Sequence, residues 1–110
     1  MSDFPMISYR EFDRLMESGR IEILIDLREP GAFSLSRILG AKNLPYSRRE
    51  EWFERLPKER RYVFYCDRGA KSMVICRDLW RKGIFAADLA GGILNYRGKY
   101  IDRRPSGALE

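Results

Sequence analysis

One stretch in the second half of the chain decides the fold: Tyr62-Val63-Phe64-Tyr65-Cys66-Asp67-Arg68-Gly69-Ala70-Lys71-Ser72. Its first four residues are aromatic or β-branched, which predicts a buried strand. Closely spaced apolar side chains follow as far as Gly83 and predict a buried helix over residues 72–82. Residues 67–71 therefore connect a strand to a helix, and Cys66 stands at the carboxyl end of the strand.

Strands and helices alternate in both directions from this stretch. Apolar runs predict further strands at residues 21–27, 41–44 and 84–89. Capping boxes that start at Ser8 and Ser47, and a proline at position 30, predict helices at 9–18, 30–35 and 47–56, with a last helical turn at 93–96. Strands separated by helices form right-handed βαβ units, so we expect an α/β fold with a parallel sheet and helices on both faces.

Length and composition limit the possible functions. The 110 residues suit a single domain, 1–110, with a core at about 6–98 and a tail at 105–110 that we attribute to an expression vector. Histidine is absent, which excludes nucleophile pairs and metal sites that need an imidazole. The two cysteines cannot fill a four-ligand zinc site, so we expect two free thiols, no metal and no cofactor.

The charge and the apolar runs predict where the chain acts. Its net charge is +5, but the basic residues are spread along the chain without a nucleic-acid recognition motif, which indicates a solvated surface and no nucleic-acid partner. No apolar run approaches the roughly 20 residues of a membrane span, and the N-terminus lacks the pattern of a secretory signal. We therefore expect no membrane partner and a cytoplasmic location.

The loop after Cys66 has features that favour an ionised sulfur. Backbone N–H groups of a tight turn that enters a helix converge on one point and favour negative charge there. Arg68 and Lys71 add two cations, and Gly69 supplies backbone freedom for the turn. Asp67 opposes them, because its negative charge adjoins the sulfur. The balance predicts a reactive nucleophile at Cys66, the alternative being an inert core cysteine.

Three further residues have predicted roles around this loop. Asp26 and Arg28 follow the strand at 21–27, and sites in such folds lie at the carboxyl ends of strands. We expect the pair to brace the loop through an ion pair or hydrogen bonds, with direct substrate contact as the alternative. Cys76 lies among apolar residues of the predicted helix and is interpreted as a core residue.

Four segments carry a signal beyond periodicity. They are Ile25-Asp26-Leu27-Arg28-Glu29-Pro30, Ile38-Leu39-Gly40-Ala41-Lys42-Asn43-Leu44-Pro45, Cys66-Asp67-Arg68-Gly69-Ala70-Lys71-Ser72, and Leu89-Ala90-Gly91-Gly92 followed by Tyr96. In this order they resemble motifs of the single-domain rhodanese-like sulfurtransferases: Asp-x-Arg-Glu, Ile-Pro-Gly-Ala-x-Asn-Ile-Pro, Cys-x-x-Gly-x-Arg-Ser and a C-terminal Gly-Gly. The resemblance covers about residues 6–98.

The resemblance implies both a fold and a reaction. The implied fold is rhodanese-like, with a parallel five-stranded sheet. In the implied reaction the catalytic Cys66 takes sulfane sulfur from a small anionic donor such as thiosulfate, while Arg68 and Lys71 hold the departing sulfite. The Cys66 persulfide then passes the sulfur to a thiophilic acceptor, cyanide in an assay and a thiol or protein persulfide acceptor in the cell. The implied substrate-binding loop is Asp67, Arg68, Gly69, Ala70, Lys71 and Ser72.

Departures from the family pattern leave two alternatives open. Relatives usually have His where Arg37 stands, Pro where Leu39 stands and Arg where Lys71 stands. One alternative is a non-catalytic rhodanese-like docking or regulatory module, which would normally lack the cysteine. The other is a phosphatase with a Cys-x5-Arg loop, but Ser72 occupies the position of that arginine.

Overall fold

The computed structural model describes residues 4–105 and contains a five-stranded parallel sheet. Its strands, in spatial order, are β1 (Met6–Ile7), β6 (Ala86–Leu89), β5 (Tyr62–Tyr65), β2 (Ile23–Asp26) and β4 (Lys42–Asn43). β5 is the third of the five strands in this order and pairs in parallel with both β2 and β6. The expected parallel five-stranded sheet is confirmed, and Cys66 directly follows its middle strand.

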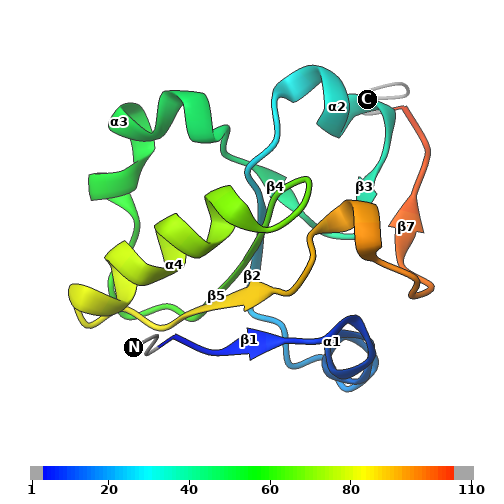
Figure 1. Ribbon diagram of the computed structural model, residues 1–110, viewed down its shortest axis with the longest axis horizontal. Coiled ribbons are helices and arrows are strands. Elements are labelled where there is room, and N and C mark those ends of the chain that lie inside the picture. Colours follow the sequence, from blue (N-terminus) through cyan, green and yellow to red (C-terminus); the bar gives the residue numbers. More distant parts are fainter. Residues whose placement is uncertain (1–3, 106–110) are drawn as a thin grey trace.

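Helices cover both faces of this sheet, as expected. The α-helices are α1 (Tyr9–Glu17), α2 (Pro30–Leu35), α3 (Arg49–Trp52) and α4 (Ala70–Arg81). The described residues also form three short 3-10 turns, η1 (Tyr46–Arg48), η2 (Phe53–Arg55) and η3 (Ile93–Asn95). In Figure 1, α3 and α4 lie together to the left of the sheet strands, whereas β3 (Arg37–Ile38) and β7 (Ile101–Asp102) lie together to the right.

The core has two halves, one on each face of the sheet. Side chains of β5 alternate between them, because successive residues of a strand point to opposite faces. Tyr62 and Phe64 pack in the half that contains α4, while Val63 and Tyr65 pack in the half that contains Phe12 of α1. All four β5 side chains are buried, so the strand that carries Cys66 is held from both sides.

A small antiparallel sheet of β3 and β7 was not anticipated from the sequence. Arg37 joins its two strands: the guanidinium donates to the carbonyls of Phe33, Ser34 and Arg104 and forms an ion pair with Asp102 at 3.1 Å. This buried arginine thus ties the end of α2 to a segment near the end of the described chain.

Two helix starts differ from expectation. α4 begins at Ala70, two residues before the predicted start at Ser72, because the chain turns at Gly69 with a φ of 110°. The capping box predicted at Ser47 is wrong: Ser47 lies inside η1, whose N-cap is Pro45, and no side chain caps α3. The predicted capping box at Ser8 is confirmed, since its side chain accepts from the Glu11 amide. The predicted tail at 105–110 lies outside the described residues from position 106 onward.

Arg37→Ala should lower the free energy of unfolding by about 3 kcal/mol, because it removes a buried cation with several partners. Urea unfolding measures this change. Arg103→Ala, at an exposed position in the same segment, is the matched control and should change stability by no more than about 0.5 kcal/mol. Equal stabilities for the two variants would contradict a structural role for Arg37.

Candidate active site

The sulfur of Cys66 receives two backbone hydrogen bonds. The amide of Gly69 lies 3.2 Å from Sγ and the amide of Ser72 lies 3.4 Å from it. Both amides belong to the turn and to the first turn of α4, where N–H groups have no partner within the helix. The expectation that N–H groups converge on the sulfur is therefore confirmed, and two partial positive charges face the atom that would carry a thiolate charge.

The early start of α4 is what aims these amides. Residues 67–69 alone separate Cys66 from the helix, and Gly69 adopts the left-handed conformation with a φ of 110°. That conformation is strained for residues with a Cβ, so glycine allows a turn this tight. A helix that began at Ser72, as expected from the sequence, would have made Ser72 its first residue, whereas Ser72 is the third residue of α4.

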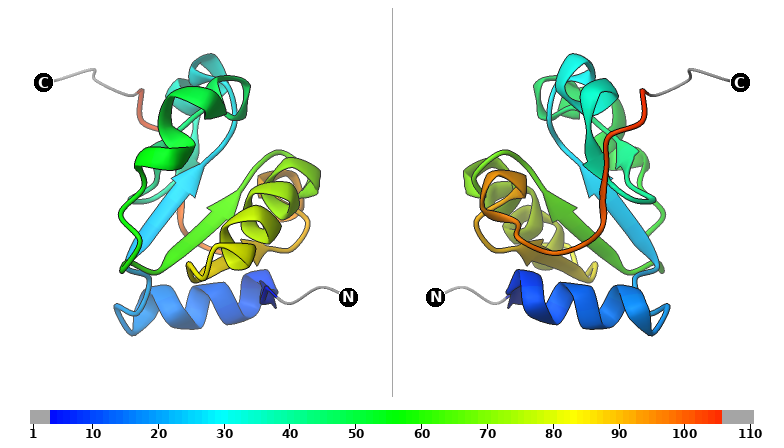
Figure 2. Two further views of the ribbon diagram at one scale, coloured as in Figure 1. Left: turned by 90° about the vertical axis from the view of Figure 1, so that its left-hand side faces the viewer. Right: turned by 90° about the vertical axis from the view of Figure 1, so that its right-hand side faces the viewer.

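The segment Gly91–Leu94 packs against the loop and forms hydrogen bonds to its carbonyls. The amide of Ile93 donates to the carbonyl of Cys66 and that of Leu94 to the carbonyl of Asp67, each at 3.0 Å. A Cβ on Gly92, whose φ is 69°, would lie 2.3 Å from the carbonyl oxygen of Asp67. Figure 2 shows η3, in orange, beside the loop that enters α4. The Gly-Gly motif thus lets two chain segments approach closely enough to fix the loop.

The rim of the loop is exposed, whereas the sulfur is enclosed. Asp67, Arg68, Ala70 and Lys71 are exposed, but Cys66 has only 3% of its surface accessible. The Lys71 ammonium lies 5.8 Å from the centroid of the Tyr46 ring, an arrangement that favours a cation over an aromatic face. A reagent that reaches the sulfur must therefore be small.

Asp26 and Arg28 lie at the same edge of the sheet as Cys66 and form a buried ion pair at 2.8 Å. Arg28 also donates to the carbonyl of Ser36, and the side chain of Asn43 donates to the carbonyls of Asp26 and Arg28. These bonds hold the β2–α2 turn to β4. The ion pair expected from the sequence is present, and its bracing of the Cys66 loop stays a prediction.

Ser72 and Asp88 form a buried polar pair next to the sulfur. The Ser72 hydroxyl donates to Oδ1 of Asp88 and lies 3.5 Å from Sγ of Cys66. Asp88 is fully buried, and burial raises its pKa to about 6 even though the bond from Ser72 lowers it. The sequence analysis missed Asp88. The available signal was an acidic residue inside the otherwise apolar run at 84–89.

Cys76 behaves as the core residue that was predicted. It is free and fully buried on α4, and burial together with the charge of Asp88 raises the pKa of its thiol. A thiol that resists ionisation is a poor nucleophile. The two cysteines therefore have different chemistry, and only Cys66 receives amide hydrogen bonds from a helix N-terminus.

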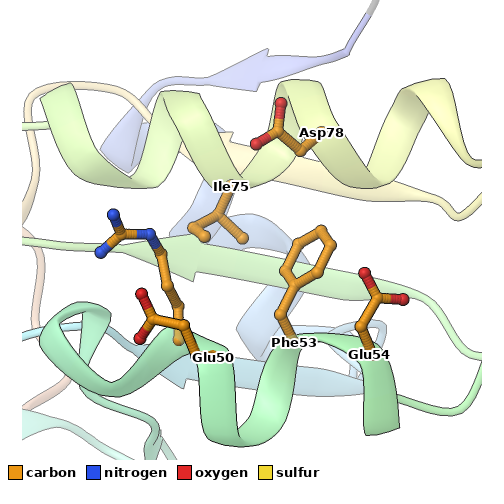
Figure 3. A pocket seen from close by; sticks show the side chains of 6 residues that line it. Glu50, Phe53, Glu54, Ile75 and Asp78 are labelled. Atoms are coloured by element: carbon orange, nitrogen blue, oxygen red, sulfur yellow. The ribbon is translucent and has the colours of Figure 1, made fainter.

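A hollow lies between the α3–η2 segment and α4, and Figure 3 shows the side chains around it. Its lining is Arg49, Glu50, Phe53, Glu54, Ile75 and Asp78. Its lining contains no cysteine that could act as a nucleophile. The loop around Cys66 is therefore the better candidate for the site.

The described residues offer little support for a metal site. Residues 4–105 contain no group of three or more His, Cys, Asp or Glu side chains placed to hold a metal ion. In the same part of the chain, every helix is too short or too polar to cross a bilayer.

Comparisons with known proteins identify the family. The sequence profile of the rhodanese-like domain matches residues 8–99. YtwF of Bacillus subtilis, named only provisionally as a sulfurtransferase, is 32% identical over 93 residues, which cover 84% of this chain and 90% of YtwF. A protein of Allochromatium vinosum named sulfurtransferase is 33% identical over 79 residues, which cover 72% of this chain and 68% of that protein. The chain therefore belongs to the rhodanese-like domain family.

A solved structure supports the same fold. A rhodanese-related protein from Thermoplasma volcanium superimposes with a TM-score of 0.78 at 23% identity, covering 92% of this chain and 100% of that one. Some curated relatives are much longer, and the chain spans 23% and 24% of the length of two of them. The family and the names of the relatives support an enzyme of the sulfurtransferase type.

Gly92→Ala should displace the loop and slow alkylation of Cys66 by iodoacetamide by about tenfold or more, because the new methyl group would overlap the backbone of Asp67. The rate of mass gain at position 66 measures the change. Gly40→Ala is the matched control: its φ of 85° is similarly strained, but a Cβ there meets no atom within 4 Å. If Gly40→Ala slows alkylation of Cys66 as much as Gly92→Ala does, backbone strain accounts for the slower rate and close packing of the two segments does not.

Asp88 should make stability depend on pH. Its folded pKa of about 6 exceeds the ordinary value of 3.8, so the folded state holds the proton more tightly and stability falls as pH rises from about 4 to 6. The difference corresponds to about 3 kcal/mol. Urea unfolding measures the free energy of unfolding at each pH. The difference between Asp88→Asn and wild type in this quantity should shift by about 3 kcal/mol in favour of the variant from pH 3.5 to pH 7. Asp78→Asn, at a partly exposed position on α4, should show no such change.

Proposed function

We propose that this protein transfers sulfane sulfur from thiosulfate, or a similarly small anionic donor, to a thiophilic acceptor through a persulfide on Cys66. The observation that carries the proposal is the pair of amide hydrogen bonds to Sγ from Gly69 and Ser72. Donors fixed in this way stabilise negative charge without reorganising during the reaction. The two amides would stabilise the thiolate before transfer, and the loop would stabilise the persulfide anion after it.

The first half-reaction balances with the groups at the site. The Cys66 thiolate attacks the outer sulfur of thiosulfate, a new S–S bond forms, and the old S–S bond breaks with its electron pair leaving on sulfite. The persulfide that remains carries one negative charge. Arg68 in the loop and Lys71 in the first turn of α4 are both exposed, and these two cations would attract the dianionic donor and hold the departing sulfite oxygens.

The enclosure of the sulfur supports a small donor. With only 3% of Cys66 accessible, bulky substrates would have to displace the rim of the loop. In the second half-reaction the outer sulfur of the persulfide lies one bond further from the protein backbone than Sγ. An acceptor such as cyanide, or the thiol of a protein partner, would then attack that outer atom, and the S–S bond would break with its electron pair moving to Sγ of Cys66.

The alternative of a docking or regulatory module makes the opposite prediction for Cys66. Such a module needs no ordered hydrogen bonds to a sulfur atom, whereas this chain has two from backbone amides. The alternative still accounts for the exposed basic rim, which would bind an acidic partner equally well. Sulfur loading on Cys66 separates the two functions.

Incubation with excess thiosulfate should add about 32 Da to the intact protein, the mass of one sulfur atom, because the thiolate of Cys66 would retain the outer sulfur. Intact-mass spectrometry under non-reducing conditions measures the gain, and cyanide should remove it. Cys66→Ala should gain nothing. Cys76→Ala should gain the same mass as wild type, because the Cys76 thiol that it lacks is buried and resists ionisation. An unchanged wild-type mass would favour the docking module.

A further inference from the structure

A buried carboxyl group lies behind the nucleophile, and the sulfur transfer described above does not use it. Asp88 sits on β6, where its register partners are Phe64 of β5 and Met6 of β1. Its Oδ1 accepts from Ser72, but its Oδ2 has no hydrogen-bond partner among residues 4–105. A buried carboxylate with an unpaired oxygen destabilises a fold, so a function is needed to explain this group.

The Ser72 hydroxyl connects this carboxyl group to the sulfur. It lies within hydrogen-bond reach of three atoms: Oδ1 of Asp88, the carbonyl of Gly69 at 3.1 Å and Sγ of Cys66 at 3.5 Å. A hydroxyl has one hydrogen to donate and two lone pairs that accept. When Ser72 donates to Asp88, it is free to accept from the thiol of Cys66. Two consecutive hydrogen bonds then run from the sulfur to the carboxyl group.

We propose that Cys66 and Asp88 share one proton through the Ser72 hydroxyl. When the thiolate forms, the S–H bond breaks, its proton passes to Oγ of Ser72, and the former hydroxyl proton of Ser72 passes to Oδ1 of Asp88. The products are a thiolate and a neutral carboxyl group. Asp88 is thus a positioning residue for the proton, since it reaches the sulfur only through Ser72.

The same path returns the proton in the second half-reaction, a step that rests on the proposed function. When the acceptor attacks the outer sulfur of the persulfide, the S–S bond breaks and Sγ of Cys66 takes the electron pair. The proton then moves from Asp88 to Ser72 and from Ser72 to Sγ, so a neutral thiol leaves instead of a thiolate. No further reactant is required, and the cycle ends with the protons where it began.

The surroundings of Asp88 suit this exchange. Burial raises its pKa to about 6, which makes the neutral form accessible close to neutral pH. Among residues 4–105, the other titratable groups near it are the thiols of Cys66, at the end of β5, and Cys76, on α4. Burial raises the pKa of Cys76, which keeps that thiol neutral, and β1 contributes only the uncharged Met6.

The coupling can be measured without any sulfur donor. In wild-type protein, carbon-13 NMR of labelled aspartate should show that Asp88 keeps its proton to higher pH than in Cys66→Ala, because the thiolate disfavours a second negative charge. Cys76→Ala, which removes the other thiol near Asp88, should titrate as wild type does. Superimposable Asp88 titration curves for wild type and Cys66→Ala would overturn the proposal.

The rate of Cys66 alkylation tests the coupling between Cys66 and Asp88 independently. Asp88→Asn cannot become negatively charged, so at pH 7 its Cys66 should react with iodoacetamide about fivefold faster than wild type, for a coupling of about one pK unit. A residue with only a structural role would leave the rate unchanged or lower it through loss of loop order. A rate equal to or below that of wild type would therefore count against a shared proton.

The two half-reactions should separate in the same variant. In single-turnover assays, Asp88→Asn should load sulfur from thiosulfate at least as fast as wild type, but it should pass sulfur to cyanide about tenfold more slowly at pH 6. Because both proteins meet the same cyanide at each pH, the ratio of their rates isolates Asp88, and this ratio should approach one by pH 8. Ser72→Ala keeps the carboxyl group but removes the hydroxyl that links it to the sulfur. This variant should therefore also pass sulfur to cyanide about tenfold more slowly than wild type at pH 6.

The outcomes distinguish this proposal from the proposed function. Coupled titration without a mass gain from thiosulfate would support the shared proton and reject the sulfur transfer. A mass gain with uncoupled titration would support the sulfur transfer and reject the shared proton. Coupled titration with equal transfer rates in wild type and Asp88→Asn would reject the return of the proton to the leaving sulfur.

Discussion

Two backbone amides aimed at one sulfur atom determine the chemistry of this fold. The amides of Gly69 and Ser72 can point at Cys66 only because the chain turns at Gly69 and enters α4 at once. The carbonyls of Cys66 and Asp67 are held from the other side by the amides of Ile93 and Leu94 in η3. The carbonyls on one face of the loop therefore have hydrogen-bond partners in the protein, and the amides on the other face are available to stabilise an anion.

Proximity to the same helix does not give the two cysteines the same reactivity. Cys66 lies just before α4, where free N–H groups and exposed cations favour negative charge. Cys76 lies within α4 against the sheet, where burial and the nearby Asp88 disfavour it. The difference is one of environment, since neither thiol has a histidine to accept its proton in a chain that contains none.

The sequence predicted those parts of the molecule that depend on local patterns. β5, α1 and α2 follow from apolar periodicity and from the capping serine and proline at their starts. β1, β3 and β7 have two residues each, which is too short for periodicity, and they exist through pairing with distant strands. Similarly, Cys66 and its cationic loop could be predicted from spacing, but the contact of Gly92 with Asp67 arises only from tertiary approach.

Asp88 shows why a site can include a residue that weakens the fold. A neutral residue at this position would remove a buried, half-satisfied charge and would also lessen the repulsion that a thiolate at Cys66 meets. Stability and thiolate formation therefore both favour replacing it. The carboxyl group has an advantage only in a step that needs a proton delivered to the sulfur. Its link to Cys66 through Ser72 is thus best explained by the sulfur's role as a leaving group, not by its role as a nucleophile.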